Sequence, residues 1–155
     1  MQFSAQQDIE APIEAAFESM ATFEIYERAA MRRGADVRRN DTLAIPGAGA
    51  QWDVRFMLRG KQRDLALEVI SFIPPTELVV SLNSKNITGT VRCELFALSK
   101  TRTRLMVATE IRPLTLPARL LVQSLKLTKS TLSQKYQTRI ADFAAEIETR
   151  YGDTV

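Results

Sequence analysis

Apolar side chains recur at helical spacing in the C-terminal part of the chain. After Pro113 they fall three, four or seven residues apart and would line one stripe of a helix: Leu121, Leu125, Leu132, Tyr136, Ile140, Phe143, Ile147 and Tyr151. Thr128 is the polar member of this series. The spacing predicts one long helix from about Thr115 to Tyr151, with Gly152 at the position of a helix terminator.

Most of the chain before Pro113 alternates between apolar and polar residues, which is the pattern of strands with one buried face. The alternation predicts seven strands, at about residues 2–9, 37–43, 52–58, 65–69, 78–82, 91–97 and 105–111. Gly60 and Lys61 predict a tight hairpin. Two short helices are expected between the first and second strands, the first opened by Pro12 and the second ended by Gly34.

These elements together predict an α+β fold. A long helix with one apolar stripe must bury that stripe, and the preceding strands offer the only extended apolar face. Short connections between the strands favour an antiparallel sheet. We therefore expect a curved, seven-stranded sheet wrapped round the C-terminal helix, in a single domain over residues 1–152 with a short tail at 153–155.

Three segments add a family resemblance to this picture. Residues 8–17, DIEAPIEAAF, resemble the opening I-x-A-P-x-E-x-V-F/W of a known superfamily, and residues 73–78, IPPTEL, resemble its x-P-P-x-x-L motif. Residues 49–52, GAQW, and the long last helix support the same match. The chain thus resembles the START, birch-pollen-allergen and polyketide cyclase/dehydrase (SRPBCC) superfamily, whose fold is called helix-grip. The resemblance implies a cavity between sheet and last helix, in which members bind, carry or transform apolar molecules.

Alternation along the strands predicts which side chains would line such a cavity. From the sheet these are Val54, Phe56, Leu67, Val69, Val80, Leu82, Val91, Leu95, Leu105 and Val107. The predicted helix adds Leu121, Leu125, Leu132 and Tyr136. A lining of this kind, apolar with a few polar groups, is typical of ligand sites. The alternative is that these side chains simply fill the core.

A few polar residues would also point inward, and each needs a partner from the protein or from a ligand. They include Thr109, Thr128, Tyr136 and Arg39. The planar guanidinium of Arg39 suits a carboxylate or phosphate. Alternatively, Arg39 is the charge that an edge strand carries to prevent aggregation.

Composition limits the chemistry. The sequence contains no histidine and a single cysteine, Cys93. This excludes an internal disulfide, a Cys/His nucleophile pair and a zinc cluster of the usual make-up. We predict no catalytic residue, no cofactor and no metal. The sequence shows no secretory signal and no apolar run of about 18 residues, so we expect a cytoplasmic protein.

The net charge of +3 is distributed unevenly. Residues 1–27 carry six acids and no base, residues 28–39 carry five arginines, and residues 112–139 carry six bases and no acid. The basic blocks would serve lipid headgroups, an acidic ligand or nucleic acid, or else the acidic N-terminal segment packs beside the basic half of the long helix. We favour the packing interpretation and expect no nucleic acid partner. The segment 114–127 either contacts a membrane surface transiently or packs as a lip on the mouth of the sheet.

The sequence thus predicts binding or transport of a hydrophobic or amphipathic small molecule, such as a lipid, a quinone or a polyketide-like ring. One alternative is a cyclase or dehydratase that uses Tyr136, Arg39 or a carboxylate in the same cavity. Another is a module that binds a protein partner through exposed arginines at 28, 32, 33 and 38. Nothing in the sequence predicts the oligomeric state.

Overall fold

The computed structural model describes residues 1–154. Within that range the strands are β1 (Gln2–Ile9), β2 (Asp36–Arg39), β3 (Gln51–Leu58), β4 (Lys61–Ile73), β5 (Glu77–Asn83), β6 (Ile87–Ala97) and β7 (Thr103–Pro113). The helices are α1 (Ile13–Met20), α2 (Phe23–Arg32), α3 (Leu116–Lys126) and α4 (Lys129–Thr154). All neighbouring strands are antiparallel, in the order β1-β7-β6-β5-β4-β3-β2. The predicted α+β architecture is confirmed.

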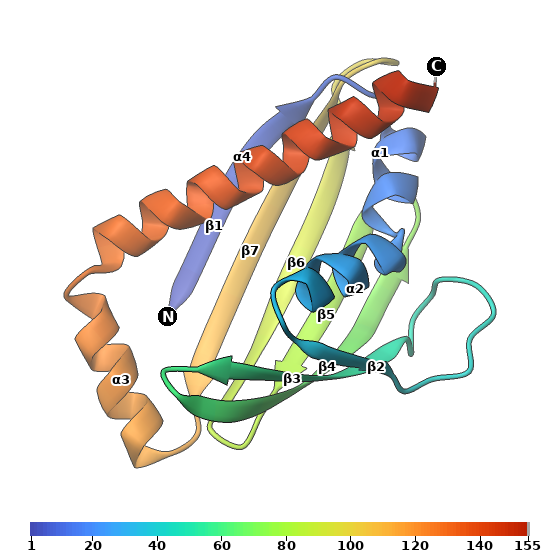
Figure 1. The fold of residues 1–155 in the computed structure, drawn as a ribbon. Coiled ribbons are helices and arrows are strands. Elements are labelled where there is room, and N and C mark those ends of the chain that lie inside the picture. Colours follow the sequence, from blue (N-terminus) through green and yellow to red (C-terminus); the bar gives the residue numbers. More distant parts are fainter. Residues whose placement is uncertain (155) are drawn as a thin grey trace.

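The strands form one curved sheet, and α1, α2 and α4 lie in front of its concave face (Figure 1). The strands β3 to β7 follow one another through short turns, and short turns can join only antiparallel strands. The β3–β4 hairpin turns at Arg59 and Gly60, one residue earlier than predicted, and Lys61 is the first residue of β4. Gly60 has a φ of 74°, a backbone conformation that strains a residue with a Cβ atom. The β4–β5 pairing shifts register between Val69 and Ser71, which is a β-bulge. Bulges bend and twist a strand, so this one adds to the curvature of the sheet.

The predicted single C-terminal helix is wrong in one respect, because it is broken into α3 and α4. At the break the amides of Leu127 and Thr128 donate to the carbonyls three residues earlier, at Ser124 and Leu125. The Thr128 hydroxyl also donates to the Leu125 carbonyl, at 3.2 Å. Serine and threonine bond to nearby backbone groups in this way and weaken a helix. At its other end α4 runs through Gly152 to Thr154, so residues 153 and 154 belong to the helix, while Val155 lies outside the described residues.

The main core lies where α1 and the C-terminal half of α4 pack on the sheet. Its fully buried members include Ile9, Met20, Leu95, Leu105 and Ile147. Burial of such side chains is the principal stabilising term in folding. This core therefore holds α4 on β1 at one edge of the sheet, while α2 packs on β2 at the opposite edge.

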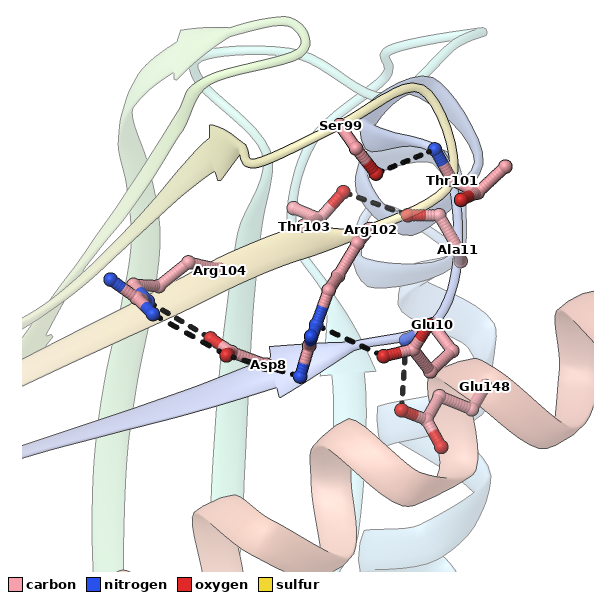
Figure 2. A network of polar contacts seen from close by, with 9 residues as sticks. All are labelled: Asp8, Glu10, Ala11, Ser99, Thr101, Arg102, Thr103, Arg104 and Glu148. Atoms are coloured by element: carbon pink, nitrogen blue, oxygen red, sulfur yellow. Dashed lines mark hydrogen bonds and ion pairs between the residues drawn. The ribbon is translucent and has the colours of Figure 1, made fainter.

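A polar network fastens the same end of the molecule (Figure 2). Asp8 accepts a hydrogen bond from Arg104 Nε at 2.9 Å, and Arg102 Nε lies 3.0 Å from the Glu10 carboxylate. The backbone amide of Glu10 donates to Glu148 on α4 at 2.8 Å. Figure 2 shows that these groups join β1, the start of β7 and α4. Each exposed ion pair alone adds little to the stability of the folded state. The network nevertheless links β1, β7 and α4, which are distant in sequence.

One buried hydrogen bond lies beside this network. The hydroxyl of Thr103, a residue with no exposed surface, donates to the carbonyl of Ala11 at 2.8 Å. Ala11 is itself fully buried in the connection between β1 and α1. The bond therefore holds the entry to α1 against the first residue of β7.

Candidate functional site

A cavity of about 330 Å³ lies between the middle of the sheet and the helices α2 and α4. The sheet contributes Val37, Trp52, Val54, Leu67, Val69, Leu78, Val80, Leu82, Val91, Cys93 and Val107. The helices contribute Met20, Phe23, Tyr26, Glu27, Ala30, Ile140 and Phe143. Almost all of these groups are apolar. The volume falls within the range of about 300–1,000 Å³ that is usual for ligand sites.

The packing of the helices explains why this space stays open. α4 packs chiefly on β1 and α1, and α2 packs on β2, so the two helices contact opposite edges of the same concave face of the sheet. The side chains of Val54, Leu67, Val80 and Val91 lie on the inner face between them, yet each is only half-buried. The hollow therefore follows from the spread of the two helices across a concave sheet.

Aromatic side chains form the wall of the cavity beside α2. Phe23 meets the Trp52 ring edge to face, with centroids 5.1 Å apart and the planes at 89°. Tyr26 lies against Phe143 of α4 at 6.1 Å. The Tyr26 hydroxyl donates to the carbonyl of Met20 at 2.5 Å, and burial raises the pKa of this phenol above its usual value. Tyr26 thus presents its ring to the cavity, while its hydroxyl is already paired and neutral.

Few polar groups face the cavity. Glu27 is the carboxylate among the lining residues within 1–154. Burial raises the pKa of the Cys93 thiol from 9.0 to about 12. Because a thiolate is the reactive form of cysteine, Cys93 is a small apolar wall group at neutral pH.

Trp52 carries a polar atom that the folded chain leaves unused. Its Nε1 is buried and has no hydrogen-bond acceptor among residues 1–154, although the residue as a whole is 7% exposed. The guanidinium of Arg39 covers the same ring at 4.9 Å. A buried donor without a partner costs about 1–3 kcal/mol. Trp52 is therefore the lining residue with the most to gain from a hydrogen-bond acceptor.

The structure places seven of the predicted site residues on the cavity wall, namely Val54, Leu67, Val69, Val80, Leu82, Val91 and Val107. Leu95 and Leu105 face inward but are buried in the main core, with 2% and 0% exposure. Phe56 lies nearer the tip of the β3–β4 hairpin and is not a lining residue. The inward direction was predicted correctly for these strand residues, but their position along the strand decides which of them reach the cavity.

The predicted helix residues do not line the cavity. Leu121 and Leu125 belong to α3, and Thr128 lies in the turn after it, because the helix breaks there. Leu132 sits in the first turns of α4, outside the cavity wall. Tyr136 stacks on Phe3 at 5.4 Å between ring centroids.

Three of the predicted polar residues, Thr109, Tyr136 and Arg39, are paired within the protein. The hydroxyls of Thr109 and Tyr136 lie 2.9 Å apart and form a hydrogen bond with each other. Arg39 Nε donates to Asp41 at 2.5 Å, and Asp41 also accepts from the backbone amides of Leu43 and Gln51. These contacts hold the pKa of the Asp41 carboxyl well below its usual value. Neither Arg39 nor Tyr136 reaches the cavity wall.

The wall also contains residues that sequence reasoning did not select. Phe23, Tyr26 and Ala30 of α2 are spaced three and four residues apart, and this spacing was the available signal that they share one face of the helix. Ile140 and Phe143 belonged to the predicted stripe of the last helix. The spacing of apolar residues did not indicate that α2, rather than the first turns of the long helix, faces the middle of the sheet across the cavity.

A second depression, of about 380 Å³, is lined by charged residues of both signs from β2, β3, β4 and the β5–β6 turn. They are Asp36, Arg38, Asp53, Arg55, Asp64 and Lys85. Arg55 and Asp64 pair at 2.9 Å and are largely exposed. Opposite charges that neutralise one another in water give this depression little preference for a charged ligand.

The basic blocks of the sequence are exposed. Arg28, Arg32, Arg33 and Arg38 all lie on the surface, and binding of a protein partner there stays a prediction. The acidic N-terminal segment does pack beside α4, through β1 and α1, and Phe3 of β1 stacks on Tyr136 in the basic half of the predicted helix. Among the described residues, however, its acids form no ion pair with the bases of residues 112–139. Asp8 and Glu10 instead pair with Arg102 and Arg104. Within residues 1–154, no helix combines the length and apolarity needed to cross a bilayer.

Comparisons with known proteins were made on sequence and on structure. No protein-family model matches the chain, and no curated protein matches it at a significant level. Similar solved structures include TTHA0849 from Thermus thermophilus, with a TM-score of 0.69 at 10% identity over 97% of this chain and 99% of that one. The Zhui aromatase/cyclase from Streptomyces sp. R1128 gives 0.65 at 10% identity, over 97% and 95% of the two chains. A START superfamily protein from Mycobacterium smegmatis gives 0.55 at 14% identity, over 86% and 95%.

These similarities are far too low in sequence to carry a function, but they agree on the architecture. The curved antiparallel sheet, the two short helices after β1 and the long C-terminal helix recur over nearly the full length of each pair. The chain therefore has the helix-grip fold of the START-like and polyketide-cyclase proteins.

Proposed function

We propose that this protein binds a small hydrophobic molecule in the cavity between the sheet, α2 and α4. The observation that carries the proposal is a hollow of about 330 Å³ whose wall is nearly all apolar and is built from three helices and six strands within residues 1–154. Folded proteins normally fill their interiors at the density of organic crystals. Transfer of an apolar guest from water into such a site is favourable by about 25 cal/mol per Å² of buried apolar surface.

The volume and the wall favour a ring system. An engineered apolar cavity of about 150 Å³ holds benzene, and this cavity is about twice as large. A molecule of two or three fused rings, or one short acyl chain, matches that space better than a lipid with two long chains. The rings of Phe23, Trp52 and Phe143 add aromatic faces, which favour stacked or edge-on contact with a flat guest.

The polar groups refine the chemical class. A carbonyl or hydroxyl oxygen on the guest would satisfy the unpaired Nε1 of Trp52 if the ring turned to bring this buried atom to the cavity surface. Glu27 disfavours an anionic guest that lies beside it. We therefore infer a neutral, largely apolar compound with at least one oxygen acceptor, such as a quinone or a polyketide-like ring.

A cyclase or dehydratase that uses the same cavity is the alternative. Of the groups that the sequence offered for catalysis, Tyr136 and Arg39 lie outside the cavity wall. Glu27 is the carboxylate on that wall and would have to act as the acid or base. A guest recovered unchanged after long incubation with the protein favours binding, whereas its conversion, lost in Glu27→Gln, favours the enzyme.

Trp52 provides the assay, because it is the only tryptophan in the sequence and lies on the cavity wall. Purified protein freed of bound lipid is titrated with 2-methyl-1,4-naphthoquinone, a two-ring quinone that quenches indole fluorescence, and free N-acetyltryptophanamide corrects for collisional quenching. We expect saturable quenching. At a hundred times the dissociation constant a ligand stabilises the folded state by about 2.7 kcal/mol. For a domain of this size that raises Tm by roughly 5–10 °C.

Two neighbouring alanines of α2 give a matched control. Ala30 lines the cavity and Ala29 does not. Ala30→Phe should abolish saturable quenching and the rise in Tm, while Ala29→Phe should retain both, with circular dichroism confirming that each variant is folded. Equal responses in the two variants, or no saturable response of the wild type to any of a panel of quinones, polycyclic ketones and short fatty acids, would contradict the proposal.

A further inference from the structure

Helix α3 exposes an unusual number of leucines. Leu116 is 68% exposed and Leu127, at the end of the helix, is 87% exposed. Leu114, Leu120 and Leu121 are also exposed. Single exposed leucines are ordinary on protein surfaces, but a cluster of them on one short segment indicates an interaction site.

Three of these leucines form a separate face of the helix. At about 100° per residue, Leu116, Leu120 and Leu127 fall within roughly 40° of one another around the axis. Ala118, which is buried, and Leu125, which is half-buried, lie on the opposite side. α3 therefore has one apolar face that packs on the protein and a second that faces solvent. Figure 1 shows α3 at the periphery, set at an angle to α4 and beyond the end of β7.

Basic residues flank the exposed face. Arg119 and Lys126 lie about 80–100° from the centre of the leucine cluster, on one side of it. Both are exposed, as is Lys129 just beyond the break, and none of the three forms an ion pair within the part of the chain that the structure describes. Between Glu110 and Asp142 the sequence has no acid at all. The exposed apolar face thus lies on a segment whose charged residues are all basic.

We propose that α3 docks on the surface of an anionic lipid bilayer. Its three outward leucines enter the boundary between headgroups and acyl chains, while Arg119 and Lys126 reach the headgroup phosphates. Exposed apolar residues flanked by bases are the pattern of helices that lie in the plane of a membrane. An α3 of 11 residues is about 16 Å long, which suits this orientation and is too short to span a bilayer.

The charges argue against a second copy of this chain as the occupant of the face. Pairing α3 with α3 would bring Arg119 and Lys126 of each copy close to those of the other, and like charges repel. An anionic surface instead gains from each base that approaches it, by about fivefold in partitioning per residue. The proposal is independent of whether the cavity is loaded.

The test is sedimentation with vesicles, one set of pure phosphatidylcholine and one containing about a third phosphatidylserine. We expect strong binding to the anionic vesicles, weak binding to the neutral ones, and loss of the difference in high salt, which screens exposed charges. The variant Leu116→Ser/Leu120→Ser should bind the anionic vesicles at least tenfold more weakly, since each leucine withdrawn from water contributes more than tenfold. Lys126→Gln should lose about fivefold.

Control substitutions lie elsewhere on the surface. Ile73→Ser removes a side chain that is 54% exposed at the end of β4, and Lys100→Gln removes a base in the β6–β7 turn, at the far end of β7 from α3. Both controls should bind like the wild type. Equal binding to the two vesicle types, wild-type binding by the α3 variants, or a dimer in solution that the leucine variants dissociate while vesicle binding is unchanged would each overturn the proposal.

Discussion

Whether the space beside β4 is hollow can be tested by one substitution, Leu67→Phe. Leu67 lies on β4 between its register partners Trp52 and Leu82, and all three line the cavity. Phenylalanine adds three carbon atoms to the side chain. If these extend into empty space, they leave water without displacing any protein atom. We then expect the folded state to gain stability.

The size of the gain follows from the transfer free energy of apolar groups. About 0.8 kcal/mol per buried methylene sets an upper limit near 2.4 kcal/mol for three carbons. Since aromatic carbons contribute less and the ring loses some freedom, we expect about 1–2 kcal/mol. For a domain of this size each kcal/mol moves Tm by about 2–4 °C. The Tm of Leu67→Phe should therefore rise by about 2–8 °C.

Leu105→Phe is the matched control, with the same chemical change on the inner face of β7. Leu105 has no exposed surface and does not line the cavity. Overpacking of a filled core costs about 1–3 kcal/mol, so this variant should lose about 2–12 °C in Tm. The measurement is thermal unfolding by calorimetry on protein freed of bound lipid. If Leu67→Phe is destabilised as much as Leu105→Phe, the space is packed and the reasoning behind the proposed function is refuted.

Three further predictions concern single groups. Thr103→Val leaves the buried Ala11 carbonyl without its donor and should lower stability in urea by about 1–3 kcal/mol; Thr103→Ser should restore most of this, and an unchanged midpoint would contradict the role of the bond. The hydrogen bond from Arg104 and the nearby positive charges hold the pKa of Asp8 below 3.8, its ordinary value. Because the folded pKa is the lower one, this stabilisation is present above about pH 4 and is lost as pH falls through the folded value; Asp8→Asn should flatten the stability profile in urea titrations from about pH 6 to pH 3, and a profile as steep as the wild type would reject the assignment. With a pKa of about 12, about one Cys93 thiol in 10⁴ is ionised at pH 8, so its reaction with a disulfide reagent should be very slow in the folded protein and become fast after unfolding in urea. Rapid labelling of the folded protein would show that the thiol is not buried as described.

Much of the architecture could be predicted from local patterns. Alternation placed the strands and their inward faces, since a strand with one buried face must alternate. The break in the last helix could not be predicted from spacing, because Leu121, Leu125 and Leu132 keep the helical period across it. The weak helix preference of Ser124 and Thr128 was the local signal, and such preferences amount to only tenths of a kcal/mol per residue. Packing elsewhere in the fold decides whether they matter.

For the cavity too, local sequence pattern predicted one property, and tertiary packing decided the rest. Inward direction is a local property, and it was correct for Val54, Leu67, Val80 and Val91, all of which reach the cavity wall. Leu95 and Leu105 follow the same alternation but are covered by α1 and α4. Which helix covers which strand depends on contacts between residues far apart in the chain, and alternation carries no information about them.

The order of polar and apolar residues was thus enough to specify strands, short helices, the antiparallel sheet and the side of each strand that faces inward, because backbone geometry alone imposes those periods. The hollow, the pairing of Arg39 with Asp41 and of Tyr136 with Thr109, and the second apolar face of α3 became evident from the folded chain alone. These features depend on where α2, α3 and α4 pack relative to the sheet. That placement results from the sum of many weak contacts across the whole molecule, and no local segment contains it.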